Sequence, residues 1–372
     1  MQKPTYDAVV IGASFAGLAC AQAMSRKGLQ VKVLEKKSWP GTRTHTTGII
    51  VRELADSWSI PARLYKKIEA VRIYSPDMEY LDLRSPEYYF LATDTPSLLR
   101  WHAEQAIQAG ASISYSYHYR NSERQNGFHH LDNGNINCRY LIGCDGSRSR
   151  VARQYSLGLN RDFLFGVEAD FDHIPDLSRS HLHVFLDNDI AKGYIAWIVP
   201  GVHVNQVGLA TRSPTAPSLE RFLDKISSLW NIDRSTVLAT RSGLIPCGGP
   251  VNPFYNGDVL LLGDAAGMVS PLTAGGIHPA VNTGTLAGEL VADHLLYQGG
   301  NPGAVLRREL PHYLFKRSLR FFYDHLPLTN HAINDLLHTP SFRVIAQTIF
   351  FHNRGFFSAA AWRDIVKMNM NF

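Results

Sequence analysis

Glycines and one carboxylate near the start of the chain are spaced as a dinucleotide site requires. Gly12 to Gly17 lies between an expected strand, residues 6–11, and an expected helix, residues 15–27. Glycines permit a tight turn and close approach of a pyrophosphate, whose charge the helix N-terminus stabilises. Glu35 ends the next expected strand, where a carboxylate accepts hydrogen bonds from ribose hydroxyls. The residues expected to bind a dinucleotide here are Gly12, Ser14, Phe15, Ala16, Gly17, Glu35 and Lys36.

Two later stretches also follow the ends of expected strands. Cys144-Asp145-Gly146 ends one strand, and Gly263-Asp264 ends another. A loop with Pro271 and Gly275-Gly276 then leads into a long helix, expected to reach about residue 296. A carboxylate at a strand end and bare amides at a helix start suit a polyhydroxy chain and an electron-rich ring. Together with the first stretch, they predict FAD as the cofactor and redox as the chemistry.

These motifs, in this order, resemble those of FAD-dependent enzymes of the aromatic-hydroxylase type. Within that group the sequence is most similar to the geranylgeranyl reductase family. Residues 242–250 and 257–277 resemble that family's Pro-x-Gly-Gly-Pro and Gly-Asp-Ala-Ala-Gly…Pro-Leu-Thr-x-x-Gly-Ile motifs. The resemblance spans roughly residues 5–298 and implies an FAD molecule extended across a first domain.

The resemblance also implies roles for individual residues. Asp264 would hold ribityl or pyrophosphate-side hydroxyls, and the amides around Gly275, Gly276 and Ile277 would face the pyrimidine edge of the flavin. Arg100, in an expected helix of residues 95–109, matches an arginine that reaches the FAD phosphates. The further expected cofactor-binding residues are Arg43, Arg100, Asp145, Gly263, Asp264, Pro271, Gly275, Gly276 and Ile277.

Two of these positions have two interpretations each. Asp145 either links FAD to an incoming nicotinamide cofactor, as in the hydroxylases, or is a carboxylate of a strand-end turn. Arg43, together with His45, either faces the flavin or an acidic substrate, or belongs to a structural loop. Residues 40–50 also lack the cysteine that the reductase family often carries near the flavin. Specificity for a prenyl chain therefore does not follow from the resemblance alone.

Three residues are candidates for the catalytic and substrate side of the site. His278 falls in the first turn of the flavin-side helix, and its near-neutral pKa suits a proton donor; the alternative is a structural histidine. Tyr194 and Trp197 fall on an expected strand at a spacing that places them on opposite faces. One would line an apolar substrate tunnel and the other would belong to the core. The four cysteines have no CxxC spacing, and no metal site is expected.

The length of 372 residues predicts two or three domains. We expect an α/β fold: a Rossmann-like FAD-binding domain built from discontinuous segments, an inserted β-rich substrate domain and a C-terminal helical region. The expected boundaries are 1–75, 92–160 and 250–300 for the FAD-binding domain, 76–91 and 161–249 for the substrate domain, and 301–372 for the helical region.

The formal net charge of +5 is concentrated near the C-terminus, where residues 305–372 contain nine basic and four acidic side chains. The same segment is rich in phenylalanine. It is either a peripheral membrane contact or an aromatic helical core with solvated arginines. The excess is too small and too interrupted to indicate nucleic-acid binding. With no apolar run of about 20 residues and a first strand that leaves no room for a signal peptide, we expect a cytoplasmic protein.

Two enzymatic functions fit these features. The first is a reductase in which reduced FAD delivers hydride to a carbon–carbon double bond of a small isoprenoid or other lipophilic substrate. The second is a monooxygenase that hydroxylates an aromatic or lipophilic substrate with NAD(P)H and O2. Gly267 and Ile277-His278 stand where such hydroxylases usually have histidine and Gly-x-Asn, which favours the reductase. The reductant would be NAD(P)H as a transient visitor or another donor, and the sequence does not indicate an oligomeric state.

Overall fold

The computed structural model divides the chain into two compact units, each built from three separated segments. The first unit comprises residues 1–44, 95–163 and 245–319, and the second comprises residues 45–94, 164–244 and 320–372. The structure describes residues 5–131, 134–212, 216–310, 313–325, 329–351 and 363.

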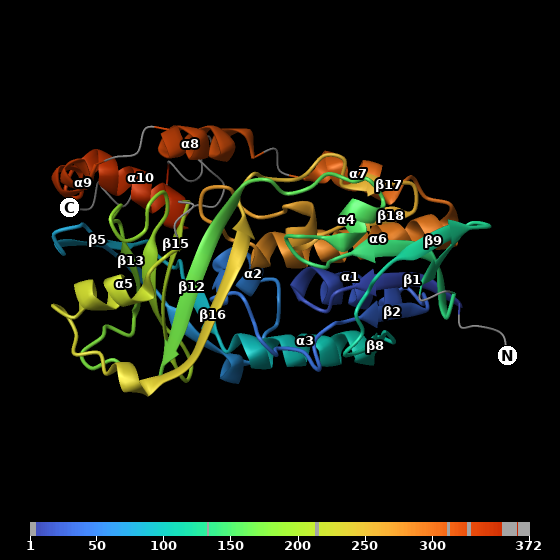
Figure 1. The fold of residues 1–372 in the computed structure, drawn as a ribbon, viewed down its shortest axis with the longest axis horizontal. Helices are drawn as coiled ribbons and strands as arrows, with labels where there is room; N and C mark the ends of the chain where they lie inside the picture. Colours follow the sequence, from blue (N-terminus) through green and yellow to red (C-terminus); the bar gives the residue numbers. More distant parts are fainter. Residues whose placement is uncertain are drawn as a thin grey trace. The chain divides into compact units, whose positions relative to one another are not determined.

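The first unit contains a sheet whose central strands are all parallel (Figure 1). Its strands, in spatial order, are β17 (Tyr255–Asn256), β18 (Val259–Leu261), β11 (Ile136–Gly143), β1 (Thr5–Ile11), β2 (Val31–Leu34) and β8 (Ser112–Ser114). A hairpin of β9 (Ser122–Gln125) and β10 (Phe128–Leu131) pairs antiparallel with β11. The expected Rossmann-like sheet from discontinuous segments is confirmed.

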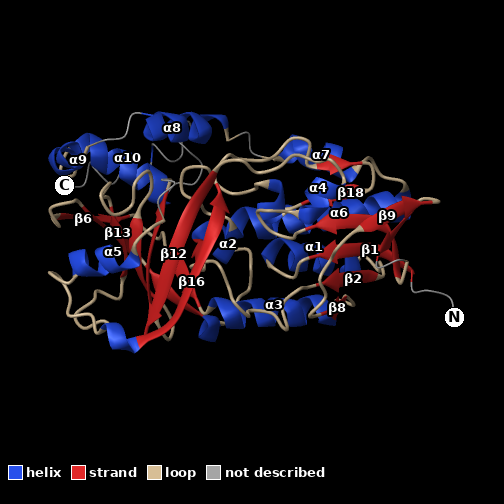
Figure 2. Cartoon of the chain, viewed as in Figure 1, coloured by secondary structure: helices blue, strands red, loops and turns tan. Residues whose placement is uncertain are grey.

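Three helices of the first unit pack side by side, with α1 between α3 and α6 (Figures 1 and 2). They are α1 (Phe15–Arg26), α3 (Thr95–Gln108) and α6 (Ile277–Tyr297). A Cβ at Gly288 would lie 2.5 Å from the carbonyl oxygen of Cys20, and one at Gly284 would lie 2.5 Å from that of Ala16. Only glycine permits this close approach, which packs the middle of α6 against the first half of α1. The shorter helices are α4 (Arg150–Gln154), α7 (Pro302–Glu309) and the 3-10 turn η3 (Gly263–Ala266).

The second unit is organised around a seven-stranded, mostly antiparallel sheet. Its spatial order is β16 (Val237–Pro246), β12 (Phe163–Phe171), β15 (Asn205–Thr211), β14 (Ala196–Pro200), β13 (His181–Phe185), β5 (Ala70–Tyr74) and β6 (Tyr80–Arg84). A smaller sheet has the order β3 (Ile49–Val51), β7 (Phe90–Thr93) and β4 (Tyr65–Ile68). The remaining short elements are α2 (Arg52–Ala55), η1 (Ala62–Leu64) and η2 (Arg234–Thr236).

Each face of the large sheet is covered by an apolar layer. On one face, α5 (Leu219–Ile226) buries Phe222, Leu223 and Ile226 against the strands. On the other, side chains of the small sheet, Leu337 after α9 (Asn330–Leu336), and Ala346 and Phe351 of α10 (Pro340–Phe351) complete a second cluster. The β-rich unit therefore has two hydrophobic cores, one on each side of its sheet.

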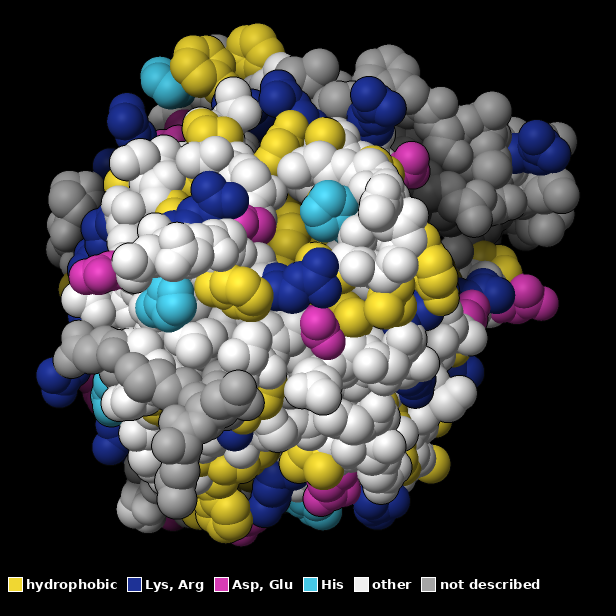
Figure 3. All heavy atoms as spheres, turned by 90° about the vertical axis from the view of Figure 1, so that its right-hand side faces the viewer, with side chains coloured by type: hydrophobic (Ala, Val, Ile, Leu, Met, Phe, Trp, Pro, Cys, Tyr) yellow, Lys and Arg dark blue, Asp and Glu magenta, His cyan; other side chains and the backbone are white. Residues whose placement is uncertain are grey.

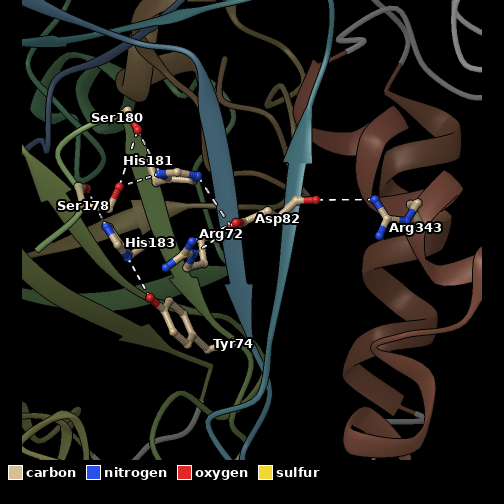
Figure 4. Close-up of polar contacts among 8 residues, drawn as sticks. All are labelled: Arg72, Tyr74, Asp82, Ser178, Ser180, His181, His183 and Arg343. Atoms are coloured by element: carbon tan, nitrogen blue, oxygen red, sulfur yellow. Dashed lines mark hydrogen bonds and ion pairs between the residues drawn. The ribbon is translucent and has the colours of Figure 1, made fainter. Parts of the chain in front are cut away.

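A partly buried polar cluster lies where β5, β6 and β13 meet (Figure 4). Arg72 donates two hydrogen bonds to Asp82, at 2.6 and 2.8 Å. His183 contacts the Tyr74 hydroxyl at 3.0 Å and the Ser178 carbonyl oxygen at 2.9 Å. Burial lowers the pKa of His183 to about 4. The pairing of β13 with β5 thus encloses a buried imidazole whose two ring nitrogens both have hydrogen-bond partners.

The expected domain boundaries differ from the two units. Residues 45–75 fall in the second unit because β4 pairs with β7 and β5 pairs with β13 and β6. Residues 301–319 belong to the first unit, where α7 packs on α6 and β17. The helices after residue 320 belong to the second unit, so the C-terminal region is not a separate body. Part of the aromatic C-terminal segment, residues 305–372, lies outside the described residues, including Phe356, Phe357 and Trp362.

Within the described part of the chain, no helix has the length and apolarity that crossing a membrane would require. Figure 3 shows one face of the molecule, on which Lys and Arg side chains are interspersed with acidic, histidine and hydrophobic ones. The cations of this face are dispersed rather than gathered into one patch.

Candidate FAD site

The glycine turn after β1 is built as the sequence predicts. Gly12 has a φ of +108°, and a Cβ there would lie 2.3 Å from the carbonyl oxygen of Cys144. A Cβ at Gly17 would lie 2.0 Å from the carbonyl oxygen of Gly12. Ser14 is exposed at the N-cap of α1, its hydroxyl makes no capping hydrogen bond, and the first turn has no acidic residue. The start of α1 is therefore suited to an anionic phosphate.

Glu35 is held directly beside this turn. Its buried carboxylate accepts hydrogen bonds from the amides of Ala13, at 2.6 Å, and Lys37, at 2.9 Å. The structure thus brings Glu35 and the glycine turn together, as a ribose–pyrophosphate site requires. Lys36 is exposed, and the Lys37 ammonium donates to the carbonyl oxygen of Arg43 at 2.8 Å.

Asp264 connects the starts of α1 and α6. A Cβ at Gly263 would lie 3.0 Å from Cβ of Ala16, and one at Gly276 would lie 3.7 Å from Oδ1 of Asp264. Part of Asp264 is exposed to solvent. Protein atoms surround its carboxyl group, and the resulting desolvation raises the pKa of this group to about 6. The N-cap of α6 is Gly276, and its first turn has no acidic residue. One carboxylate and the N-termini of two helices therefore converge, a combination that suits ribityl hydroxyls and a pyrophosphate.

The loop that follows Asp264 is shaped by residues from two distant segments. Gly267 has a φ of +65°, and a Cβ there would lie 2.5 Å from the carbonyl oxygen of Gly249 and 2.6 Å from Oδ1 of Asn160. Asn160 donates to the carbonyl oxygens of Asp264, at 2.8 Å, and Ser147, at 3.0 Å. Sequence reasoning missed Asn160, because no motif marks it. Further along the loop, Pro271 is buried and Gly275 is exposed.

Asp145 accepts hydrogen bonds at the start of α4, whose N-cap is Ser149. Its Oδ1 accepts from the Ser149 hydroxyl at 2.6 Å, and its Oδ2 accepts from the amides of Arg150, at 2.5 Å, and Val151, at 3.2 Å. Both carboxylate oxygens are thus used at the start of α4. This geometry favours the interpretation of Asp145 as a turn carboxylate.

Arg100, which was matched to the phosphate-binding arginine, and Arg43 are both exposed. Arg100 on α3 donates to the Ser97 hydroxyl at 3.0 Å and stacks 5.8 Å from the centroid of the Trp39 ring. Arg43 lies in a loop whose Gly41 approaches α3, since a Cβ at Gly41 would lie 2.4 Å from the carbonyl oxygen of Pro96. The loop of Arg43 and the helix of Arg100 are therefore neighbours.

The three candidate catalytic residues are divided between the units. His278 is the second residue of α6 in the first unit and is half-buried. Trp197 lies on β14 in the second unit, and its indole Nε1–H donates to Oε2 of Glu168 at 2.5 Å. Tyr194 is buried but precedes β14, so the expected opposite faces of one strand were wrong for this pair. The strand begins only at Ala196, after a turn in which the Tyr194 amide donates to the Ala191 carbonyl oxygen.

Residues 5–301 match the profile of the FAD binding domain family. The chain belongs to this family. FAD is therefore its cofactor, and the chain is an FAD-dependent oxidoreductase. The geometry of the glycine turn, of Glu35 and of the Asp264 region fits FAD.

The resemblance to the geranylgeranyl reductase family is confirmed by curated relatives. Digeranylgeranylglycerophospholipid reductase 2 of Methanopyrus kandleri is 28% identical over 316 residues, which cover 77% of each chain. Digeranylgeranylglycerophospholipid reductase of Methanocaldococcus jannaschii is 24% identical over 301 residues, again 77% of each chain.

Solved structures confirm the α/β flavoprotein fold. A geranylgeranyl bacteriochlorophyll reductase-like protein from Thermoplasma acidophilum aligns with a TM-score of 0.80 at 17% identity, over 94% of this chain and 97% of that one. A probable FAD-dependent monooxygenase from Pseudomonas aeruginosa aligns with a TM-score of 0.70, also at 17% identity, over 90% and 100%. A reductase-like protein and a probable monooxygenase thus share this fold, so the fold alone does not distinguish the two activities.

Proposed function

We propose that this protein uses FAD to reduce carbon–carbon double bonds of an isoprenoid or other lipophilic substrate. The observation that carries the proposal is the similarity over 77% of the chain to relatives named as digeranylgeranylglycerophospholipid reductases. Gly267 supports it, because the crowding by Gly249 and Asn160 leaves no room there for the histidine usual in hydroxylases.

The geometry of the first unit supports the following cofactor-binding roles. The start of α1 binds the pyrophosphate, Glu35 accepts from the ribose, and Asp264 accepts from hydroxyls of the ribityl chain. The amides around Gly275, Gly276 and Ile277 stabilise negative charge at the pyrimidine edge, since they open a 21-residue helix. When bound and reduced, FAD would supply the hydride and would itself be reoxidised.

Addition of hydride to an alkene leaves a carbon that must also gain a proton. His278 is the proposed donor, because it lies in the same helix turn as the proposed flavin-facing amides and imidazole titrates near neutrality. The electron source is proposed to be NAD(P)H acting as a transient visitor.

A single-turnover experiment tests the function without knowledge of the natural electron donor. The FAD-loaded protein is reduced with dithionite under anaerobic conditions and mixed with a geranylgeranyl lipid. Mass spectrometry should show a gain of two hydrogen atoms per reduced double bond as the flavin absorbance returns. A lipid that is unchanged without oxygen but gains an oxygen atom when oxygen and NADPH are supplied would instead establish the monooxygenase.

We further propose that the C-terminal region contacts a membrane surface peripherally. Helix α8 (Leu314–His325) exposes Phe321 and Phe322, each to 57%, and Arg317 is exposed on the same helix. Exposed aromatic side chains beside cations are typical of helices that lie in a lipid interface. The native protein should sediment with anionic vesicles. A variant with Phe321→Ser and Phe322→Ser should stay in the supernatant. Equal recovery of both in the supernatant would refute the contact.

A further inference from the structure

A row of side chains crosses the large sheet of the second unit and changes from apolar to charged. The strand registers place Val184 opposite Trp197, Trp197 opposite Gly208, and Gly208 opposite Glu168. Val184 belongs to the apolar cluster on this face, and Trp197 packs against that cluster. Trp197 therefore stands where the apolar part of the face meets the polar part.

The indole of Trp197 lies across Gly208. A Cβ at Gly208 would lie 2.7 Å from two carbons of the indole, so any larger residue would displace the ring. Two strand spacings separate the backbones of Trp197 and Glu168, about 10 Å. The indole spans this gap over the glycine and donates its Nε1–H to Glu168 at 2.5 Å.

The Glu168 carboxylate is buried, at 4% exposure, and each of its oxygens has a donor. Oε2 accepts from Trp197 and, at 2.6 Å, from the Thr47 hydroxyl, and Oε1 accepts from Arg241. Arg241 also donates to Asp170 at 2.6 Å. Glu168 thus forms an ion pair with Arg241 in the protein interior, and the indole N–H donates to a carboxylate that this pair holds in place.

We propose that Glu168 is the positioning residue for Trp197, which it holds flat on the sheet as an apolar surface for the lipid substrate. The proposal rests on the proposed function for the identity of that substrate. Thr47 adds a second constraint, since it lies in the segment by which the chain enters the second unit at residue 45. Glu168 thereby constrains both the indole ring of Trp197 and the segment that contains Thr47.

The informative substitution is Glu168→Gln. Glutamine keeps the size, and Arg241 will attract its carbonyl oxygen, so the amide NH2 is left facing the indole N–H. The glutamine NH2 and the indole N–H are both donors, so the hydrogen bond that holds the Trp197 ring is lost. We expect KM for a geranylgeranyl lipid to rise on the order of tenfold while kcat changes less. Glu168→Ala is unsuitable, because it leaves the partly buried Arg241 without this acceptor and endangers folding.

A double-mutant cycle separates positioning from a purely structural role. In Trp197→Phe the ring remains but its N–H is gone, so adding Glu168→Gln should cause little further change in KM. Equal effects of Glu168→Gln in the two backgrounds would overturn the proposal. Asp82→Asn is the matched control: it weakens the Arg72–Asp82 ion pair of the same sheet and should leave KM unchanged.

A substrate-free measurement tests the same contact. The indole ¹H–¹⁵N resonance of Trp197, assigned by its absence in Trp197→Phe, should move in Glu168→Gln and stay in place in Asp82→Asn. An unmoved resonance in Glu168→Gln overturns the positioning role whether or not the lipid is reduced. If the resonance moves but no variant, nor the native protein, reduces the lipid, then only the proposed function fails.

Discussion

At the level of single residues, Glu35 should decide how tightly the ADP half of FAD is bound. Its carboxylate is already aligned beside the glycine turn by the amides of Ala13 and Lys37. Glu35→Ala should raise the dissociation constant for FAD on the order of tenfold or more, because hydrogen bonds to a charged acceptor contribute about 1.5–3 kcal/mol. Titration of FAD fluorescence with apoprotein measures this. Asp7→Asn is the control, since Asp7 holds the Gln30 amide at the opposite end of the same strands; an equal loss there would contradict the assignment.

His278 should separate the two half-reactions. If His278 donates the proton, His278→Asn abolishes turnover of the alkene but leaves the rate at which dithionite reduces the bound flavin unchanged, because asparagine cannot act as an acid near pH 7. Stopped-flow absorbance follows the flavin, and mass spectrometry follows the lipid. His294→Asn, at the far end of the same helix, should retain turnover. Full turnover by His278→Asn would end the proton-donor role.

At the level of elements, the contact between α1 and α6 should tolerate no added methyl group. Gly288→Ala gains up to about 1 kcal/mol of helix propensity. Its Cβ, however, would lie 2.5 Å from the Cys20 carbonyl oxygen and 2.7 Å from Cβ of Ala23. Over-packing of this kind costs about 1–3 kcal/mol. We therefore expect a net loss of stability in urea and weaker binding of FAD, whose site includes the starts of both helices. Gly300→Ala, whose Cβ would meet only Cγ2 of Val305 at 3.6 Å, should be near neutral.

The pairing of β13 with β5 should make the second unit sensitive to acid. Burial lowers the pKa of His183 to about 4, with Ser178, His181, Arg72 and Asp82 as the further influences. The unfolded chain, with a histidine pKa near 6.5, binds more protons between these two values. The free energy of unfolding therefore falls as the pH falls from about 6.5 to about 4, by up to about 3 kcal/mol. Urea unfolding at several pH values should show this slope, and His183→Gln should flatten it.

An exposed histidine provides the comparison for that measurement. The side chain of His331 on α9 is 88% exposed. His331→Gln should leave the slope between pH 6.5 and 4 unchanged. If His183→Gln kept the native slope, acid sensitivity would have to arise from other groups.

At the scale of the whole molecule, the sequence predicts what is local and misses what is distant. Short local stretches of sequence predict the glycine turn, Glu35 at the end of a strand and the start of α6. The structure has each of them at the expected position. The division into units places residues 45–75 outside the expected FAD-binding domain, because β5 pairs with β13, more than a hundred residues later. The contact of Glu168 with Thr47 spans 121 positions and has no sequence signature. Tyr194 was misplaced because aromatic and β-branched residues before Ala196 resemble a strand even where the backbone turns.

Because the first unit is assembled from three separated segments, one ligand should protect all three at once. FAD should slow hydrogen exchange in residues 12–35, around Arg100 and in residues 263–278, while β13 and β5 of the second unit exchange as before. ADP is the matched control, since it carries the adenine, ribose and pyrophosphate but no flavin. It should protect residues 12–35 and leave residues 275–278 unprotected. Equal protection of residues 275–278 by ADP would show that the start of α6 binds phosphate rather than the flavin ring, and would reverse the orientation assigned to the cofactor.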